Sequence, residues 1–155
     1  MDIEKTKYSE IEILKSWFAD KESSYYWCGP GLRYPFTHST FLEDIHWEKM
    51  ATYSLLSEGG QFIGFGQYYE KAGRCHLARL VVSPHLRTKG VGRQFILQLM
   101  SIGMADLNVT ECSLFVVDHN QKALGCYRSL GFKKEQYPPD RDLIEDIEFM
   151  VYRHA

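Results

Sequence analysis

A basic, glycine-containing segment between two apolar stretches has the composition of a phosphate-binding loop. This segment, SPHLRTKGVGRQF, runs from Ser83 to Phe95 and contains the two glycines Gly90 and Gly92. Its cationic side chains are those of Arg87, Lys89 and Arg93. Glycine lacks a Cβ and lets the backbone approach a ligand closely, and the unpaired N–H groups at the start of a helix attract phosphate. The chemistry that these residues predict is therefore the binding of an anion such as pyrophosphate.

Two common phosphate-binding motifs do not fit this segment. A P-loop needs a lysine and a hydroxyl residue directly after its second glycine, whereas Arg93 and Gln94 follow Gly92 here. A dinucleotide-binding fingerprint needs a third glycine at the position of Phe95. The sequence therefore argues against ATP hydrolysis and against NAD binding.

The formal net charge of the chain is −2, but the basic residues are distributed unevenly. No acidic residue lies between Glu70 and Asp106, and residues 71–105 have a charge of +6, while the rest of the chain has 12 basic and 20 acidic residues. The six basic residues of this stretch are Lys71, Arg74, Arg79, Arg87, Lys89 and Arg93. A local positive segment on a weakly acidic protein favours a discrete anionic ligand over general nucleic-acid binding. A solvated basic face is the simpler alternative.

The spacing of apolar residues around this segment predicts a protein of mixed class. Alternating or short continuous apolar runs predict strands, and apolar residues three and four positions apart predict helices. The predicted strands are two within residues 52–70 around SEGGQ, and others at 75–82, 112–117 and 146–154. The predicted helices cover about 8–19, a segment after Thr40, 91–108 and 120–132. The aromatic segment 23–37 is predicted to be irregular because Gly29, Pro30 and Gly31 interrupt it. This order of elements gives an α/β or α+β fold.

Length and composition predict a single domain over residues 1–155 with no membrane segment. The longest nearly uncharged apolar run, residues 95–105, is too short to cross a bilayer. The first residues alternate charged and apolar types, unlike a signal peptide, so a cytoplasmic location is expected. The four cysteines, Cys28, Cys75, Cys112 and Cys126, form no C-x-x-C pair and no zinc-site spacing, so reduced thiols and no metal are expected.

Two motifs together resemble the GNAT N-acetyltransferase superfamily. The first is LVVSPHLRTKGVGRQFI, in which a strand is followed by the pattern R-x-x-G-x-G. The second is VVDHNQKALGCYRSLGF, which matches N-x-x-A-x-x-x-Y-x-x-x-G-F through Asn120, Ala123, Tyr127, Gly131 and Phe132. The motifs follow in the order and separation of that family and cover residues 75 to 133.

The resemblance implies a GNAT fold and acetyl-CoA as the cosubstrate. Its central sheet is mixed, mostly antiparallel and splayed between the fourth and fifth strands, with about four flanking helices. Pantetheine is expected to lie in the gap and to pair with the backbones of Leu80 and Val82, and the amides from Arg87 to Gly92 are expected to hold the pyrophosphate. The full set of implied coenzyme-binding residues is Leu80, Val81, Val82, Arg87, Thr88, Lys89, Gly90, Val91, Gly92, Arg93 and Asn120.

The implied reaction is acetyl transfer to a primary amine, which must lose a proton because a lysine-like amine has a pKa of about 10.4. By its position in the second motif, Tyr127 is the predicted general acid toward the sulfur of coenzyme A; a role in packing alone is the alternative. His76 is the predicted base because a histidine has a suitable pKa. Glu70, His119 and a water-relayed proton are the rivals. An acyl-cysteine on Cys126 is disfavoured, because no histidine lies at helical spacing beside it.

The acceptor is expected to be a small-molecule amine or a protein N-terminus or lysine, and the sequence does not choose between them. The segments implied to frame its site are the aromatic residues 23–37 and the acidic residues 135–149, which together favour a cationic amine. A packed aromatic core with a solvated acidic loop is the alternative. A second hypothesis is a non-catalytic acetyl-CoA sensor that acts through a protein partner. Neither nucleic acid nor membrane is an expected partner, and the chain is expected to be a monomer or a homodimer.

Overall fold

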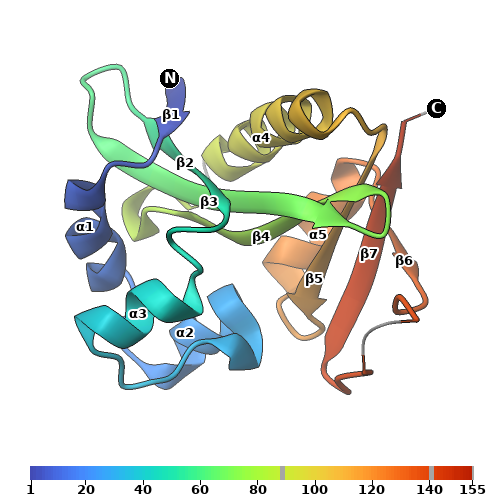
Figure 1. The fold of residues 1–155 in the computed structure, drawn as a ribbon, viewed down its shortest axis with the longest axis horizontal. Helices are drawn as coiled ribbons and strands as arrows, with labels where there is room; N and C mark the ends of the chain where they lie inside the picture. Colours follow the sequence, from blue (N-terminus) through green and yellow to red (C-terminus); the bar gives the residue numbers. More distant parts are fainter. Residues whose placement is uncertain (88–89, 140–141, 155) are drawn as a thin grey trace.

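A computed structural model describes residues 1–87, 90–139 and 142–154, and within these ranges seven strands form one sheet (Figure 1). The strand order is β1-β2-β3-β4-β5-β7-β6. The strands are β1 (Asp2–Lys5), β2 (Ala51–Leu56), β3 (Phe62–Lys71), β4 (Arg74–Val82), β5 (Glu111–Val117), β6 (Lys133–Glu135) and β7 (Ile147–Arg153).

The sheet opens between β4 and β5, as the sequence predicted. These two strands are parallel and pair only at Cys75 with Cys112 and at His76 with Ser113. The other neighbouring strands in the described ranges are antiparallel. Three residues after His76, β4 has a bulge at Arg79, whose φ is +52°. A bulge bends its strand, and beyond His76 no described strand pairs with the edge of β4 on the β5 side.

Helices cover the sheet in two groups, each with its own apolar core (Figure 1). The helices of the described residues are α1 (Ile11–Ser16), α2 (Lys21–Cys28), α3 (His38–Asp44), α4 (Val91–Leu107) and α5 (Gln121–Ser129), with short 3-10 turns at Tyr8–Glu10, Gly29–Gly31 and Pro84–Leu86. Helices α4 and α5 share a core with β3, β4 and β5 that includes Phe95, Leu99 and Leu124. Helices α1, α2 and α3 pack together around Trp27 and Phe41. None of the described helices is long and apolar enough to cross a membrane.

The predicted strands are confirmed, and so are the predicted helices except for the start of the one expected after Thr40. Helix α3 begins earlier, at His38, because Thr37 caps it by accepting a hydrogen bond from Thr40 N at 3.1 Å. One helix was missed. The segment predicted to be irregular contains α2, because Asp20 caps it by accepting a hydrogen bond from Ser23 N at 2.8 Å. Trp27 also stacks on Phe18 with ring centroids 4.2 Å apart, so that tertiary packing stabilises this helix. The short edge strands β1 and β6 were not predicted either.

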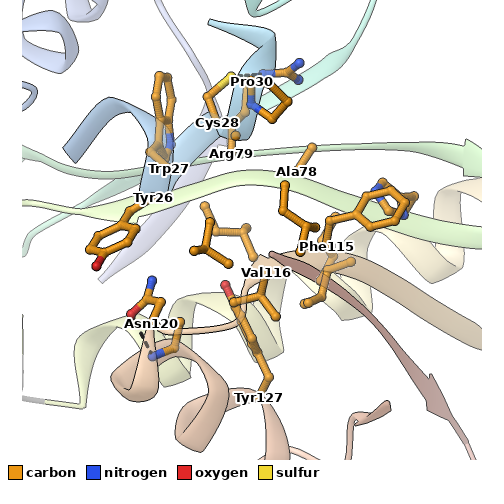
Figure 2. A pocket seen from close by; sticks show the side chains of 18 of the residues that line it. Tyr26, Trp27, Cys28, Pro30, Ala78, Arg79, Phe115, Val116, Asn120 and Tyr127 are labelled. Carbon is orange, nitrogen blue, oxygen red and sulfur yellow. Dashed lines mark hydrogen bonds between the residues drawn. The ribbon is translucent and has the colours of Figure 1, made fainter. Parts of the chain in front are cut away.

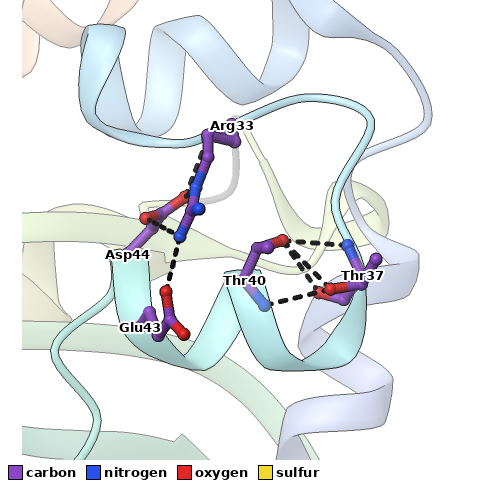
Figure 3. Close-up of polar contacts among 5 residues, drawn as sticks. All are labelled: Arg33, Thr37, Thr40, Glu43 and Asp44. Atoms are coloured by element: carbon purple, nitrogen blue, oxygen red, sulfur yellow. Dashed lines mark hydrogen bonds and ion pairs between the residues drawn. The ribbon is translucent and has the colours of Figure 1, made fainter.

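Polar contacts fix the chain between α2 and α3, which contributes to the site (Figure 3). Arg33 pairs with Glu43 at 2.7 Å and with Asp44 at 3.0 Å. Burial opposes ionisation of Asp44, but the hydrogen bonds from Arg33 hold the pKa of this carboxyl below its usual value. Thr37 and Thr40 exchange backbone-to-hydroxyl hydrogen bonds at the start of α3. The segment after Gly29 is therefore anchored to α3.

Candidate functional site

Two adjoining cavities meet where β4 and β5 separate. The loop cavity, about 690 Å³, lies against Arg87, Gly90 and Gly92, and the inner cavity, about 570 Å³, lies between β4, β5 and α2. Residues that line both are Tyr26, Trp27, Leu80, Asn120, Ala123 and Tyr127. A ligand that enters from the loop cavity can therefore present one end to a second ligand in the inner cavity.

The loop cavity has the features of an anion site at the start of α4. Gly90 precedes the helix with φ +77°, a left-handed conformation that favours glycine. A Cβ on Gly92 would lie 3.9 Å from the nearest atom, a methyl of Val82, so the space over this residue is open. The side chains of Arg87 and Arg93 line the same cavity, and Val91 packs against the core beneath. Thr88 and Lys89 lie outside the described residues.

The three predicted residues at the end of β4, Leu80, Val81 and Val82, all line the loop cavity. Val81 and Val82 pair with β3 on one side, whereas no described strand pairs with this part of β4 on the other. The carbonyl of Val82 accepts a hydrogen bond from Arg87 Nε at 3.2 Å. This segment therefore offers an open strand edge beside the anion site.

Asn120 and Tyr127 project from α5 toward the junction of the two cavities (Figure 2). Asn120 caps the helix by accepting a hydrogen bond from Ala123 N at 3.4 Å, which leaves its amide NH₂ for a ligand. The Tyr127 hydroxyl makes no hydrogen bond to the described residues. Burial raises the pKa of Tyr127, so the phenol is protonated at neutral pH and can donate a proton.

His76 lies in the inner cavity at the point where the sheet opens. Its side chain is 3% exposed, and Nδ1 lies 2.8 Å from the hydroxyl of Ser113 on β5. The rings of Tyr69 and Phe115 flank it at 5.1 and 5.0 Å. Its position is therefore fixed on several sides.

The rival bases lie elsewhere. Glu70 is exposed and accepts a hydrogen bond from Gly73 N, while His119 is exposed beside Asp118, and neither lines the two cavities. Cys126 lines the loop cavity, but burial raises the pKa of its thiol. A raised pKa disfavours the thiolate that a covalent mechanism needs.

Two residues of the cavities were missed as site residues by sequence reasoning. Trp27 lines both cavities, and its buried indole N–H has no hydrogen-bond partner in the structure. An unpaired buried donor is costly, and a ligand acceptor would satisfy it. Arg79 lines the inner cavity from the bulge of β4. The sequence does contain a signal for Arg79 as a site residue, because an arginine within a predicted buried strand is unusual.

The described ranges contain no group of three His, Cys, Asp or Glu side chains that could hold a metal. The four cysteines are free thiols. The absence of a metal therefore stays a prediction, and the described residues offer no candidate metal site that would contradict it.

Comparisons with known proteins agree with the two sequence motifs. A family model described as the acetyltransferase (GNAT) family matches residues 12–132. The uncharacterized N-acetyltransferase YhfO of Bacillus subtilis (strain 168) is 32% identical over 88 residues, which cover 52% of this chain and only 58% of that protein.

Solved structures share the fold at low identity. The spermidine N-acetyltransferase of Vibrio cholerae in complex with CoA and spermine has a TM-score of 0.75 at 16% identity, over 98% of this chain and 94% of that one. The PaiA N-acetyltransferase of Thermoplasma acidophilum in complex with coenzyme A has a TM-score of 0.70 at 21% identity, over 99% and 98% of the two chains.

Proposed function

Since the chain belongs to the acetyltransferase (GNAT) family, we propose that it is an N-acetyltransferase domain that moves an acetyl group from acetyl-CoA directly to a primary amine. The observation that carries this proposal is the meeting of two cavities in the gap between β4 and β5, with Tyr127 in the wall of both. Direct transfer needs two substrates to meet, and one cavity alone would serve a binding protein equally well.

The loop cavity suits the coenzyme. The N–H groups at the start of α4 and the side chains of Arg87 and Arg93 would hold the pyrophosphate. The open edge of β4 at Leu80 and Val82 would pair with the pantetheine amides, with the Val82 carbonyl exchanging its bond to Arg87 for one to the ligand. Asn120 would reach the same arm with its free amide group.

The residues at the junction suit proton transfer. As the amine nitrogen bonds to the acetyl carbon and the carbon–sulfur bond breaks, Tyr127 would give its proton to the departing sulfur. His76 would take the proton of the amine, directly or through a water, because it lines the inner cavity where the amine must lie. If His76 is this base, a His76→Asn variant loses the acidic limb of the profile of kcat/KM against pH; an unchanged limb removes it from the mechanism.

Thermal unfolding with and without acetyl-CoA tests the coenzyme site, with ATP and NAD as control ligands. At a concentration 100-fold above Kd, a ligand stabilises the fold by about 2.7 kcal/mol, which is a rise in Tm of roughly 5–10 °C for a chain of this length. Gly92→Glu places a carboxylate in the open space of the loop cavity and is expected to abolish the rise.

The matched control is Gln94→Glu, which adds the same charge on an exposed residue of α4 outside both cavities. It should keep the response to acetyl-CoA. A wild-type protein that is folded but shows no rise with acetyl-CoA contradicts the proposal. A rise without release of CoA in the presence of any amine supports a sensor instead.

A further inference from the structure

The inner cavity is basic, and this bears on the acceptor under the proposed function. Its lysine, arginine and histidine lining residues are His46, Lys49, His76 and Arg79, and no aspartate or glutamate of the described residues lines it. The rest of its wall is largely aromatic and aliphatic. Such a cavity repels a polycation and attracts a group of negative charge.

Arg79 is the cation held in place within this wall, beside Cys28 and Pro30 (Figure 2). Its Nη1 donates to Gln67 Oε1 at 2.9 Å and its Nε to Cys28 Sγ at 3.2 Å. The amide of Gln67 is itself fixed, because its Nε2 donates to Ile45 O at 2.7 Å. The guanidinium is therefore held in one orientation before any ligand arrives.

The charge of Arg79 has no counter-ion among the described residues. Gln67 is neutral, and burial raises the pKa of the Cys28 thiol in spite of the nearby arginine, so this thiol is neutral as well. Within the described part of the chain, Nη2 of Arg79 makes no hydrogen bond. The planar fork of a guanidinium matches a carboxylate, which could accept hydrogen bonds from the remaining donors of Arg79.

The acidic residues near the end of the chain do not supply this partner. Asp146 accepts hydrogen bonds from Tyr25 at 2.8 Å, and Glu135 pairs with Arg153. Glu148 lies 3.8 Å from Lys134. Within the described residues, no carboxylate of the acidic segment expected to attract a cationic amine lines the inner cavity.

We infer that the acceptor is an amine that also carries a carboxylate, with Arg79 binding the carboxylate while the amine faces His76 and Tyr127. This inference rests on the proposed function and narrows its substrate class. The alternative is that Arg79 only joins β4 to α2 through its hydrogen bond to Cys28. In that case the cavity would bind a carboxylate-bearing amine no more tightly than the matching amine without a carboxylate.

Binding of matched amine pairs tests the inference without depending on turnover. The pairs are L-phenylalanine with phenethylamine and 6-aminohexanoate with hexylamine, and spermidine is added as a polycation; Kd is measured by calorimetry with CoA present and absent. We expect at least one carboxylate-bearing amine to bind about 10- to 100-fold more tightly than its partner, as for a hydrogen-bonded ion pair. Arg79→Gln should make the two Kd values of a pair equal, and Arg79→Lys should keep part of the difference between them.

Arg74→Gln is the control, because Arg74 lies on the same strand but outside the inner cavity, paired with Glu111 at 2.8 Å. It should keep the wild-type ratio. The inference is overturned if no carboxylate-bearing amine binds more tightly than its partner, if spermidine binds best, or if a folded Arg79→Gln keeps the preference. If Arg79→Gln does not fold, the wild-type ratios and Arg79→Lys decide.

Release of CoA with the same amines separates this inference from the proposed function. Acetylation of phenethylamine, hexylamine or spermidine in preference to the carboxylate-bearing amines leaves the transferase proposal standing and overturns the inference. Preferential binding of a carboxylate-bearing amine without any acetylation supports the inference on binding and contradicts the transferase.

Discussion

At the scale of single residues, Tyr127 has the position and protonation state of a general acid. It lines both cavities, and its hydroxyl is not used by another described residue. Burial raises its pKa, which keeps the proton on the phenol at neutral pH, so that the hydroxyl is available as a hydrogen-bond and proton donor. Its ring also meets Phe132 edge-on at 5.9 Å, so packing and chemistry use different parts of one side chain.

Replacement of Tyr127 by phenylalanine separates these two roles. We expect kcat to fall by about 100-fold, the lower end of general acid catalysis, with little change in the affinity for acetyl-CoA, because the ring and its contacts remain. Steady-state kinetics of CoA release measure kcat, and calorimetry measures the Kd for acetyl-CoA.

Tyr152→Phe is the matched control. Tyr152 also contacts Phe132, at 5.8 Å, but lies outside both cavities, and its loss of a hydroxyl should leave kcat unchanged. A Tyr127→Phe enzyme with wild-type turnover would assign Tyr127 to packing alone.

At the scale of elements, α4 begins at the loop cavity and packs tightly on the sheet. Its close approach depends on Gly103, where an added Cβ would lie 2.5 Å from Cys75 Sγ and 3.2 Å from the ring of Tyr68. Cys75 is one of the two residues of β4, with His76, that pair with β5. The helix therefore rests on the sheet beside the point at which the strands begin to separate.

Gly103→Ala is expected to destabilise the fold by about 1–3 kcal/mol, because overpacking in a close-packed core outweighs the helix propensity gained. The measurement is the free energy of unfolding in urea. Gly125→Ala, in α5, has nothing within 4 Å of its added Cβ and should instead stabilise by about 0.5–1 kcal/mol. Equal effects of the two substitutions would contradict the close contact between α4 and the sheet.

At the scale of the whole molecule, one hydrogen-bonded pair joins the helices of the first quarter of the chain to its last strand. Tyr25, on α2, donates to both carboxylate oxygens of Asp146 at 2.8 Å, immediately before β7. Burial, together with this hydrogen bond, raises the pKa of Tyr25 to about 12. This contact connects opposite walls of the inner cavity, to which Tyr26 and Ile147 belong.

Tyr25→Phe should lower stability by about 1.5 kcal/mol at neutral pH, the usual contribution of a hydrogen bond to a charged group. The folded pKa lies above the unfolded value of about 10, so the contribution is complete below pH 10 and decreases between pH 10 and 12 as the unfolded chain ionises first. Urea unfolding of both proteins across this range gives the difference. Tyr34→Phe, which removes an exposed hydroxyl bonded to Ala19 O, should show a smaller loss at neutral pH.

The sequence predicted the elements from β2 to α5 and the final strand well, because each has a clear apolar period or a turn signal. The glycines at 59–60 predicted the hairpin between β2 and β3. The resemblance of the two motifs to a known family predicted the open sheet and the loop before α4. Helix α2 could not be predicted in this way. Its formation depends on the cap at Asp20 and on stacking of Trp27 against Phe18, a contact made only when the chain is folded.

The same division holds for the site. The sequence alone predicted the proposed coenzyme loop, since glycines, cations and a helix start are local properties, and its motif spacing predicted Tyr127 as the general acid. Only the tertiary structure decided the charge of the inner cavity, because that depends on which side chains from distant segments share one space. Arg79, Lys49 and His46 all line this cavity, and none of the described acidic residues near the end of the chain does.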